Sequence, residues 1–370
     1  MKATSVRSIL LGSCAVLCGF ALPTFSVQAA ESPDAKTLKE SDVWFDDYRF
    51  RDGEMLNRLH IHYATLGSPH YNNSGDIDNA ILLLHWTGNS GASLTTPTYM
   101  RSLYSSGAPL DSSRYFLIIP DNVGHGHSSK PSDGLKAKFP QYGYGDIVDI
   151  QHKLITETLG IKHLHAILGM SMGGMNAWQW AEAYPDQMDG VMSVVALPVK
   201  VSGRNKLWRQ IAINDIQSDP EWADGNYTSP PVGLKRATEV IAMMIDGVPH
   251  LQKTIPNQEA AQIFIEANDK RGGSIDANDL LYSLRSSGDY DPEPNLSSIT
   301  TKVFVLDFDD DEFNPVSLHV LERLMPRVQH GSFVIQAGTE NSFGHLTMAH
   351  PELWVSHVAT FMREIDNHER

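Results

Sequence analysis

Residues 163–185 read HLHAILGMSMGGMNAWQWAEAYP, and this segment decides how the rest of the chain is interpreted. It begins with the apolar run Ala166–Leu168, which is typical of a buried strand. It then passes through Gly169-Met170-Ser171-Met172-Gly173 and continues as a helical pattern up to Pro185. A strand, a Gly-x-Ser-x-Gly turn and a helix in direct succession are the context of a nucleophile elbow. A chance match in a glycine-rich turn is the alternative, and the flanking strand and helix argue against it. The pattern therefore predicts that the Ser171 hydroxyl stands clear at the end of a strand.

The N-terminal residues 1–29 have the pattern of a secretory signal peptide. Lys2 and Arg7 form a basic start, residues 9–20 are apolar, and Val27-Gln28-Ala29 resembles a cleavage site. The apolar stretch is too short to cross a bilayer, so we expect no stable membrane insertion. The sequence thus predicts a periplasmic or secreted protein.

Composition limits the partners of the remaining chain. Both cysteines, Cys14 and Cys18, lie inside residues 1–29, so the mature chain has no disulfide and no thiolate metal site. The formal charge of −15 becomes −17 once Lys2 and Arg7 are removed. Such an acidic chain argues against nucleic acid and anionic membranes as partners. We expect a small-molecule ester or acyl substrate instead.

Apolar runs typical of buried strands recur along the chain and are separated by helical patterns. The predicted strands are residues 43–50, 56–63, 78–85, 115–120, 166–168, 188–197, 302–308 and 332–337. This alternation predicts an α/β protein with a mostly parallel central sheet and helices on both faces. Residues 198–301 show helical patterns but no convincing strand. We predict that they form a helical cap inserted between a first core part, residues 30–197, and a second, residues 302–370. A separate helical domain is the alternative.

A serine nucleophile needs a base, and the base needs an acceptor that fixes its tautomer. In this architecture the chain order is serine, acid, histidine, with each residue following a strand. Asp311 follows the strand at 302–308 and His345 follows the last strand, so we predict a catalytic triad of Ser171, Asp311 and His345. Asp310 is the alternative acid. His350 is the less favoured histidine because it adjoins the final helix.

The strand at residues 78–85 ends in the loop His85-Trp86-Thr87-Gly88-Asn89. A loop in this position supplies one half of the oxyanion hole, and the residue after the serine supplies the other. We therefore predict the backbone N–H groups of Met172 and Thr87 as oxyanion donors, with Trp86 as the alternative to Thr87. We expect no cofactor and no metal, since the acidic run at 309–312 lacks the glycine and alternate-position ligands of a calcium loop.

With these residues laid out, the chain resembles the α/β-hydrolase superfamily and, within it, the homoserine O-acetyltransferase-like branch. The resemblance runs from about Ile81 to the C-terminus. Its most specific parts are Ser171-Met172-Gly173-Gly174-Met175 and the cap segment Arg209–Ile216. The resemblance implies that the serine carries an acyl group and passes it to an alcohol or to water. It maps the family's serine, aspartate and histidine onto the predicted triad, and it makes a homodimer a candidate assembly.

The chain departs from the acyltransferase pattern in three places. Met170 stands where glycine is usual, Trp86-Thr87-Gly88-Asn89 stands for Leu-Thr-Gly-Asp, and Leu346 stands where aspartate usually follows the histidine. The last change removes a charge suited to an ammonium group. Together with the export signal, these differences favour a serine ester hydrolase. The alternatives are an O-acyltransferase and, from another class, a catalytically inactive binding protein on the same fold.

Within the cap, Trp208, Met243, Met244 and Ile245 suggest an apolar chamber, although such residues are more often cap core than pocket wall. Arg204 and Arg209 are candidate carboxylate ligands, with surface or anchoring roles as the alternative.

Overall fold

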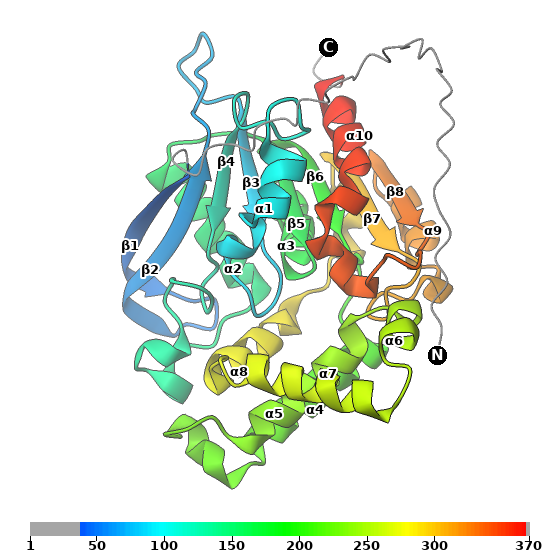
Figure 1. Ribbon diagram of the computed structural model, residues 1–370. Helices are drawn as coiled ribbons and strands as arrows, with labels where there is room; N and C mark the ends of the chain where they lie inside the picture. The colour runs from blue at the N-terminus through cyan, green and yellow to red at the C-terminus, as the bar shows by residue number, and fades with distance from the viewer. Residues whose placement is uncertain (1–37, 368–370) are drawn as a thin grey trace, which may run out of the picture.

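A single eight-stranded sheet forms the centre of the computed structural model, which describes residues 38–367. The strands lie in the order β1-β2-β4-β3-β5-β6-β7-β8 (Figure 1). Their bounds are Lys39–Arg49 (β1), Met55–Leu66 (β2), Ala80–Leu84 (β3), Phe116–Pro120 (β4), Leu164–Met170 (β5), Met188–Val194 (β6), Lys302–Phe308 (β7) and Gly331–Gln336 (β8). The β1–β2 and β2–β4 pairs are antiparallel, and the other five neighbouring pairs are parallel. The predicted mostly parallel sheet is confirmed.

Helices cover both faces of this sheet because the buried strands point apolar side chains to either side. In β3, Leu82 and Leu84 join one core cluster, while Ile81 and Leu83 join the other. The helices of the core have the bounds Pro97–Tyr99 (α1), Tyr144–Lys153 (α2), Met172–Ala183 (α3), Val320–Leu324 (α9) and Val355–Asp366 (α10). Helices α2, α3 and α9 pack in the first cluster, and α1 and α10 pack in the second. This two-sided burial is the layered arrangement that a parallel sheet requires.

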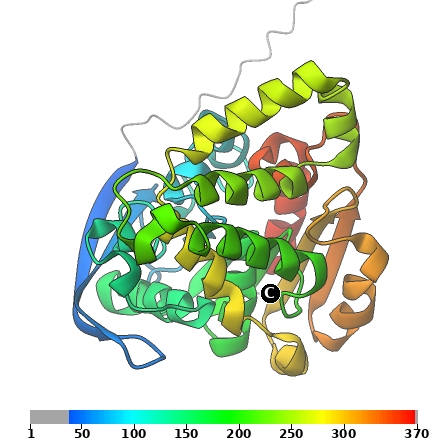
Figure 2. The ribbon, with the colours of Figure 1, turned by 90° about the horizontal axis from the view of Figure 1, so that it is seen from below.

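The segment between β6 and β7 is helical and lies at one end of the sheet, as Figure 2 shows from below. Its helices are Gly203–Gln217 (α4), Val232–Ile245 (α5), Val248–Thr254 (α6), Gln258–Gly272 (α7) and Ala277–Arg285 (α8). A separate apolar cluster, which includes Trp208, Trp222 and Leu281, packs α4, α5 and α8 together. The segment therefore has a small core of its own and covers the carboxyl ends of the parallel strands.

Some details differ from the sequence expectations. Helix α6 was not predicted, because its seven residues contain Pro249 and are too few for a helical period. The strand predicted at 188–197 ends as β6 at Val194, since Val195 takes a positive φ of 48°. The predicted signal peptide lies outside the described residues. Within residues 38–367, no helix has the length and apolar character needed to cross a bilayer.

Candidate active site

Ser171 lies in a strained turn between β5 and α3, as the elbow pattern predicts. Its backbone has φ 52° and ψ −111°, a conformation that L-residues rarely adopt. Glycine is required on both sides of the serine because neighbouring backbone atoms lie too close for a side chain. A Cβ on Gly169 would lie 2.0 Å from the carbonyl oxygen of Gly173, and one on Gly173 would lie 2.2 Å from that of Leu84. The tight turn presents the Ser171 hydroxyl at the N-terminus of α3.

The structure brings Ser171, His345 and Asp311 into one hydrogen-bonded series. The Nε2 atom of His345 lies 2.8 Å from Oγ of Ser171, and its Nδ1 atom lies 2.7 Å from Oδ2 of Asp311. All three residues are buried. Asp311 also accepts hydrogen bonds from the Phe313 N–H at 2.7 Å and from Nδ2 of Asn314 at 3.0 Å. These donors fix the carboxylate so that it faces the imidazole, which is the arrangement a catalytic base requires.

Each aspartate of the run after β7 has a different contact. Asp309 accepts a hydrogen bond from the Gly338 N–H, and Asp310 accepts one from Oγ of Ser342 at 2.8 Å. Only Asp311 of the three reaches His345 among the described contacts. The alternative acid, Asp310, therefore supports the loop that carries the histidine and does not touch the histidine itself.

A fourth aspartate, Asp307, is fully buried at the end of β7. Burial and the nearby Asp311 raise the pKa of Asp307 well above its usual value. Asp307 therefore favours its neutral form.

His350, the less favoured histidine of the sequence analysis, lies outside this series. It stacks on Phe343, and its Nδ1 atom lies 3.3 Å from Oε1 of Glu352.

The loop after β3 lies beside Ser171 and lines the same cavity through Trp86, Thr87 and Gly88. Within residues 38–367, the Thr87 N–H donates no hydrogen bond to another group. The Met172 N–H is also free, because the first N–H groups of a helix have no partner within it. Both predicted oxyanion donors are thus available to a ligand.

His85, which sequence reasoning did not assign a role, fixes the start of this loop. Its ring bridges the Trp86 carbonyl oxygen, 3.0 Å from Nδ1, and the Asn122 N–H, 3.1 Å from Nε2. The N–H donates to Nε2, so Nδ1 carries the proton that the carbonyl accepts. Burial lowers the pKa of His85 to about 4, and the neutral ring that results suits both contacts. Its only signal in the sequence is its place directly after an apolar strand.

A cavity of about 500 Å³ lies between the cap and the core, and two residues of the predicted triad line it. Ser171, His345 and Leu346 line it from the core, and Trp208 and Ile245 line it from the cap. Of the other predicted chamber residues, Met244 is buried in the cap core and Met243 is exposed. The wall is largely apolar, so the cavity suits an acyl group with few charges.

One cation, Arg209 of α4, is buried in the wall of this cavity. Its Nε atom donates to Oδ1 of Asn205 at 3.1 Å, but Nη1 has no hydrogen-bond partner among the described residues. The buried hydroxyl of Tyr144 lies beside both Arg209 and Thr87 and interacts with each, without a hydrogen bond of regular geometry. Burial lowers the pKa of Arg209, an effect that Tyr144 partly offsets. Arg204, the other candidate, is exposed and forms an ion pair with Glu312 at 2.7 Å.

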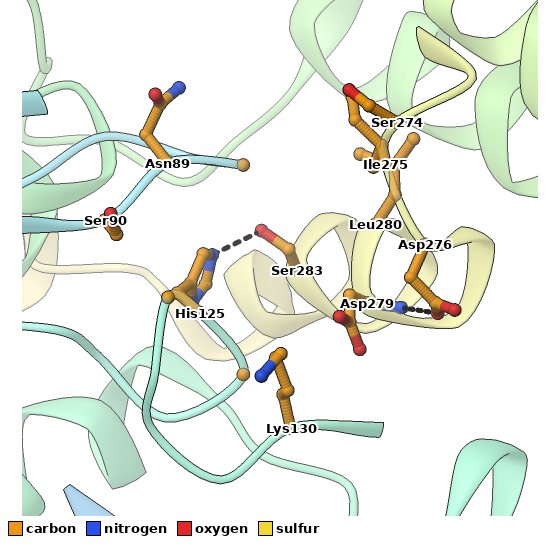
Figure 3. A pocket seen from close by; sticks show the side chains of 13 residues that line it. Asn89, Ser90, His125, Lys130, Ser274, Ile275, Asp276, Asp279, Leu280 and Ser283 are labelled. Carbon is orange, nitrogen blue, oxygen red and sulfur yellow. Dashed lines mark hydrogen bonds between the residues drawn. The ribbon is translucent and has the colours of Figure 1, made fainter. Parts of the chain in front are cut away.

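A second cavity of about 320 Å³ adjoins the first at Gly88 and Asn89 (Figure 3). Its polar groups join the core to helix α8. Oγ of Ser283 donates to Nε2 of His125 at 2.9 Å, and Asp279 accepts from the Ser132 N–H at 2.9 Å. These hydrogen bonds link the core to helix α8 and so attach the cap to the core.

The fold agrees with comparisons to known proteins. Residues 79–237 match the family model described as the alpha/beta hydrolase fold. A probable acyltransferase of Methanothermobacter thermautotrophicus is 27% identical over 298 residues, which cover 79% of this chain and 90% of the relative. A homoserine O-acetyltransferase of Caulobacter vibrioides is 27% identical over 340 residues, which cover 80% and 87%. The solved structure of the acetyl esterase MekB has a TM-score of 0.75 at 23% identity and covers 88% of this chain and 97% of its own.

The chain therefore has the α/β-hydrolase fold, and it is an enzyme of the acyltransferase or esterase kind. Its sequence is homoserine O-acetyltransferase-like.

Proposed function

We propose that the protein transfers acyl groups through an ester on Ser171 to an alcohol that carries a carboxylate. The observation that carries this proposal is the buried guanidinium of Arg209, which lines the same cavity as Ser171 and forms no ion pair among the described residues. An unpaired buried charge is costly, so a ligand carboxylate is the natural partner. The acyltransferase relatives support transfer over the hydrolysis that the sequence analysis favoured.

In the proposed reaction, Oγ of Ser171 attacks the acyl carbon of an ester or thioester while Nε2 of His345 takes the hydroxyl proton. The negative charge that forms on the acyl oxygen is stabilised by the N–H groups of Met172 and Thr87, each typically worth about 3 kcal/mol. The histidine then protonates the leaving group. In the second half, His345 takes the proton of the acceptor hydroxyl, whose oxygen attacks the acyl carbon of the acyl-enzyme. The bond to Oγ of Ser171 breaks, and His345 returns the proton to this oxygen. Asp311 holds the imidazole and stabilises its charged form in both halves.

Ester hydrolysis is the second candidate, with water as the acceptor. The observation in its favour is Leu346, an apolar residue that lines the cavity directly after His345. The rest of the wall is also mainly apolar, and a neutral ester needs no charged partner.

Acetyl transfer from p-nitrophenyl acetate separates the two candidates. The purified protein is given this donor with homoserine, with 4-hydroxybutyrate or with 3-aminopropan-1-ol, and the products are identified by mass spectrometry. The first two acceptors carry a carboxylate, whereas the third keeps the hydroxyl and amine of homoserine without it. We expect O-acetylation of a carboxylate-bearing acceptor and little of aminopropanol. Acetate as the sole product would support hydrolysis, and equal use of all three acceptors would exclude a carboxylate site.

We also propose that the protein is exported, on the strength of the pattern in residues 1–29. The test is the N-terminal sequence of the protein recovered from a Gram-negative host. A mature chain that starts near Ala30 in the periplasmic fraction is expected, whereas an intact Met1 in the cytoplasmic fraction would contradict export.

A further inference from the structure

The core fixes the loop that carries His345 through one carboxylate. The Asp310 carboxylate accepts hydrogen bonds from Oγ of Ser342 at 2.8 Å and from the Gly344 N–H at 3.1 Å. These contacts fix the backbone immediately before the histidine. The Asp310 carboxylate also lies next to Gly247 of the cap, where an added Cβ would be 2.8 Å from its Oδ2 atom.

Residues 246–250, which we call the cap turn, comprise the link between α5 and α6 and the first turn of α6, and they contact the loop that carries His345. Gly247 and Gly344 lie back to back. A Cβ on Gly247 would be 2.8 Å from the Gly344 nitrogen and 2.8 Å from Oδ2 of Asp310, and a Cβ on Gly344 would be 2.5 Å from the Gly247 nitrogen. No side chain fits between these two backbones. A displacement of this cap turn would therefore directly displace Gly344, the residue before His345.

Side chains on either side of the glycine pair extend this contact. Nδ1 of His250 lies 2.8 Å from Oδ2 of Asp246, and the His250 ring packs edge-on against Phe343 with 4.7 Å between centroids. Asp246 also lines the cavity that contains Ser171. The cap turn thus reaches from the cavity wall to both residues that precede the histidine.

A second part of the cap contacts the histidine through one intermediate ring. Trp208 of α4 stacks on Phe313 with 5.0 Å between centroids, and Phe313 packs edge-on against His345 at 4.6 Å. The imidazole ring therefore packs on the core residue Phe313, and the cap residue Trp208 supports Phe313 in turn.

We propose that the cap turn at residues 246–250 is a positioning element for His345, so that the triad is aligned only when the cap is seated. This inference rests on the proposed role of His345 as the base for Ser171. The cap then does more than close off the cavity. Because a misplacement of about 1 Å can lower a rate by about a hundredfold, small displacements of this turn are expected to affect the chemical step.

The sharpest test is Gly247→Ala. Gly247 has φ −73° and ψ 141°, which alanine adopts without strain, so the added methyl acts only against Gly344 and Asp310. The matched control is Gly288→Ala, where an added Cβ meets nothing within 4 Å. The readouts are the rate of Ser171 labelling by a fluorophosphonate, kcat and KM for p-nitrophenyl acetate, and the Tm.

We expect Gly247→Ala to lower the labelling rate and kcat at least about tenfold while KM changes less than about threefold. Gly288→Ala should match wild type in all readouts. A Gly247→Ala protein that folds and labels at the wild-type rate would overturn the inference. Absence of labelling in wild type itself would instead overturn the proposed function.

His250→Ala keeps the inference testable if Gly247→Ala does not fold. It removes the contacts with Asp246 and Phe343 at a partly exposed site. The control is His70→Ala, which removes a more exposed His–Asp pair, with Asp78 at 2.7 Å. We expect a loss of kcat of about threefold or more in the first variant only, since the displacement is smaller. Equal kcat values in the two variants would contradict the proposed positioning role.

Discussion

The Nε2 atom of His345 lies 2.8 Å from Oγ of Ser171, although 174 positions separate the two residues in the chain. The contact exists because β5 and β8 are parallel strands of one sheet, and both residues follow the carboxyl ends of their strands. Asp311 reaches the same imidazole from the end of β7.

Replacement of Asp310 and replacement of Asp311 by asparagine should lower the activity by very different amounts. Asp311→Asn removes the carboxylate that selects the imidazole tautomer, so kcat for p-nitrophenyl acetate should fall by about ten-thousandfold. Asp310→Asn weakens only the support of Ser342 and Gly344, so a loss of about tenfold is expected. Circular dichroism and Tm establish that both variants fold. Similar losses in the two variants would mean that Asp311 is not the acid of the triad.

Arg209→Met should separate acceptor binding from acyl-enzyme formation. A charge-assisted hydrogen bond is worth about 1.5–3 kcal/mol, so kcat/KM for a carboxylate-bearing acceptor should fall by about tenfold to a hundredfold. Labelling of Ser171 by a fluorophosphonate should change less than about threefold. The control is Arg204→Met, which breaks the exposed pair with Glu312. An unchanged acceptor kcat/KM in Arg209→Met would remove the basis of the proposed carboxylate site.

Gly173→Ala should destabilise the elbow. The new methyl would lie 2.2 Å from the Leu84 carbonyl oxygen, and overpacking of this kind costs about 1–3 kcal/mol. Urea unfolding should report a lower free energy of unfolding, and labelling of Ser171 should slow. Gly288→Ala, with open space around its Cβ, is the reference. Wild-type stability in Gly173→Ala would show that α3 does not approach β3 as closely as described.

Acid should weaken the fold through buried neutral histidines. Burial lowers the pKa of His85 to about 4, whereas an unfolded histidine titrates near 6.5. Between these values the unfolded chain binds a proton that the folded chain excludes, so the free energy of unfolding falls as the pH falls from about 6.5 toward 4. For His85 the loss approaches roughly 3 kcal/mol. His125, whose pKa burial lowers to about 3, acts in the same direction.

The measurement is urea unfolding of wild type and His85→Gln at pH 7 and pH 4.5. Asp279 has the opposite effect, because burial raises its pKa to about 6, and the comparison of variant with wild type cancels it. The variant should lose less stability than wild type over this interval. An equal loss in both proteins would show that His85 is not the group that titrates.

The core of the fold was predictable from sequence because its strands are short apolar runs with clear ends. The apolar run of β5 and the glycines at 169 and 173 also identified Ser171, because a turn this tight requires glycine on both sides of the serine. The cap was predictable as helical, but α6 was not, because seven residues hold too few turns to show a period.

Other features depend on packing that leaves little trace in sequence. Asp310 and Asp311 are identical in type and adjacent, so only the three-dimensional path of the loop distinguishes their partners. Arg204 and Arg209 lie five positions apart on one helix, yet the first is exposed and the second is buried beside the cavity. The glycine pair at 247 and 344 joins two segments that sequence reasoning treated separately.

The position of β8 at the edge of the sheet affects which part of the site is lost first on heating. It is the last strand of the sheet, it pairs only with β7, and all six of its residues are only half-buried. His345 follows this edge strand, whereas Ser171 follows a strand in the interior of the sheet. Edge elements open locally at a lower cost than the global free energy of unfolding. On heating, the protein should therefore lose its base before it loses its fold, with activity declining at temperatures where most of the backbone amides are still protected from hydrogen exchange.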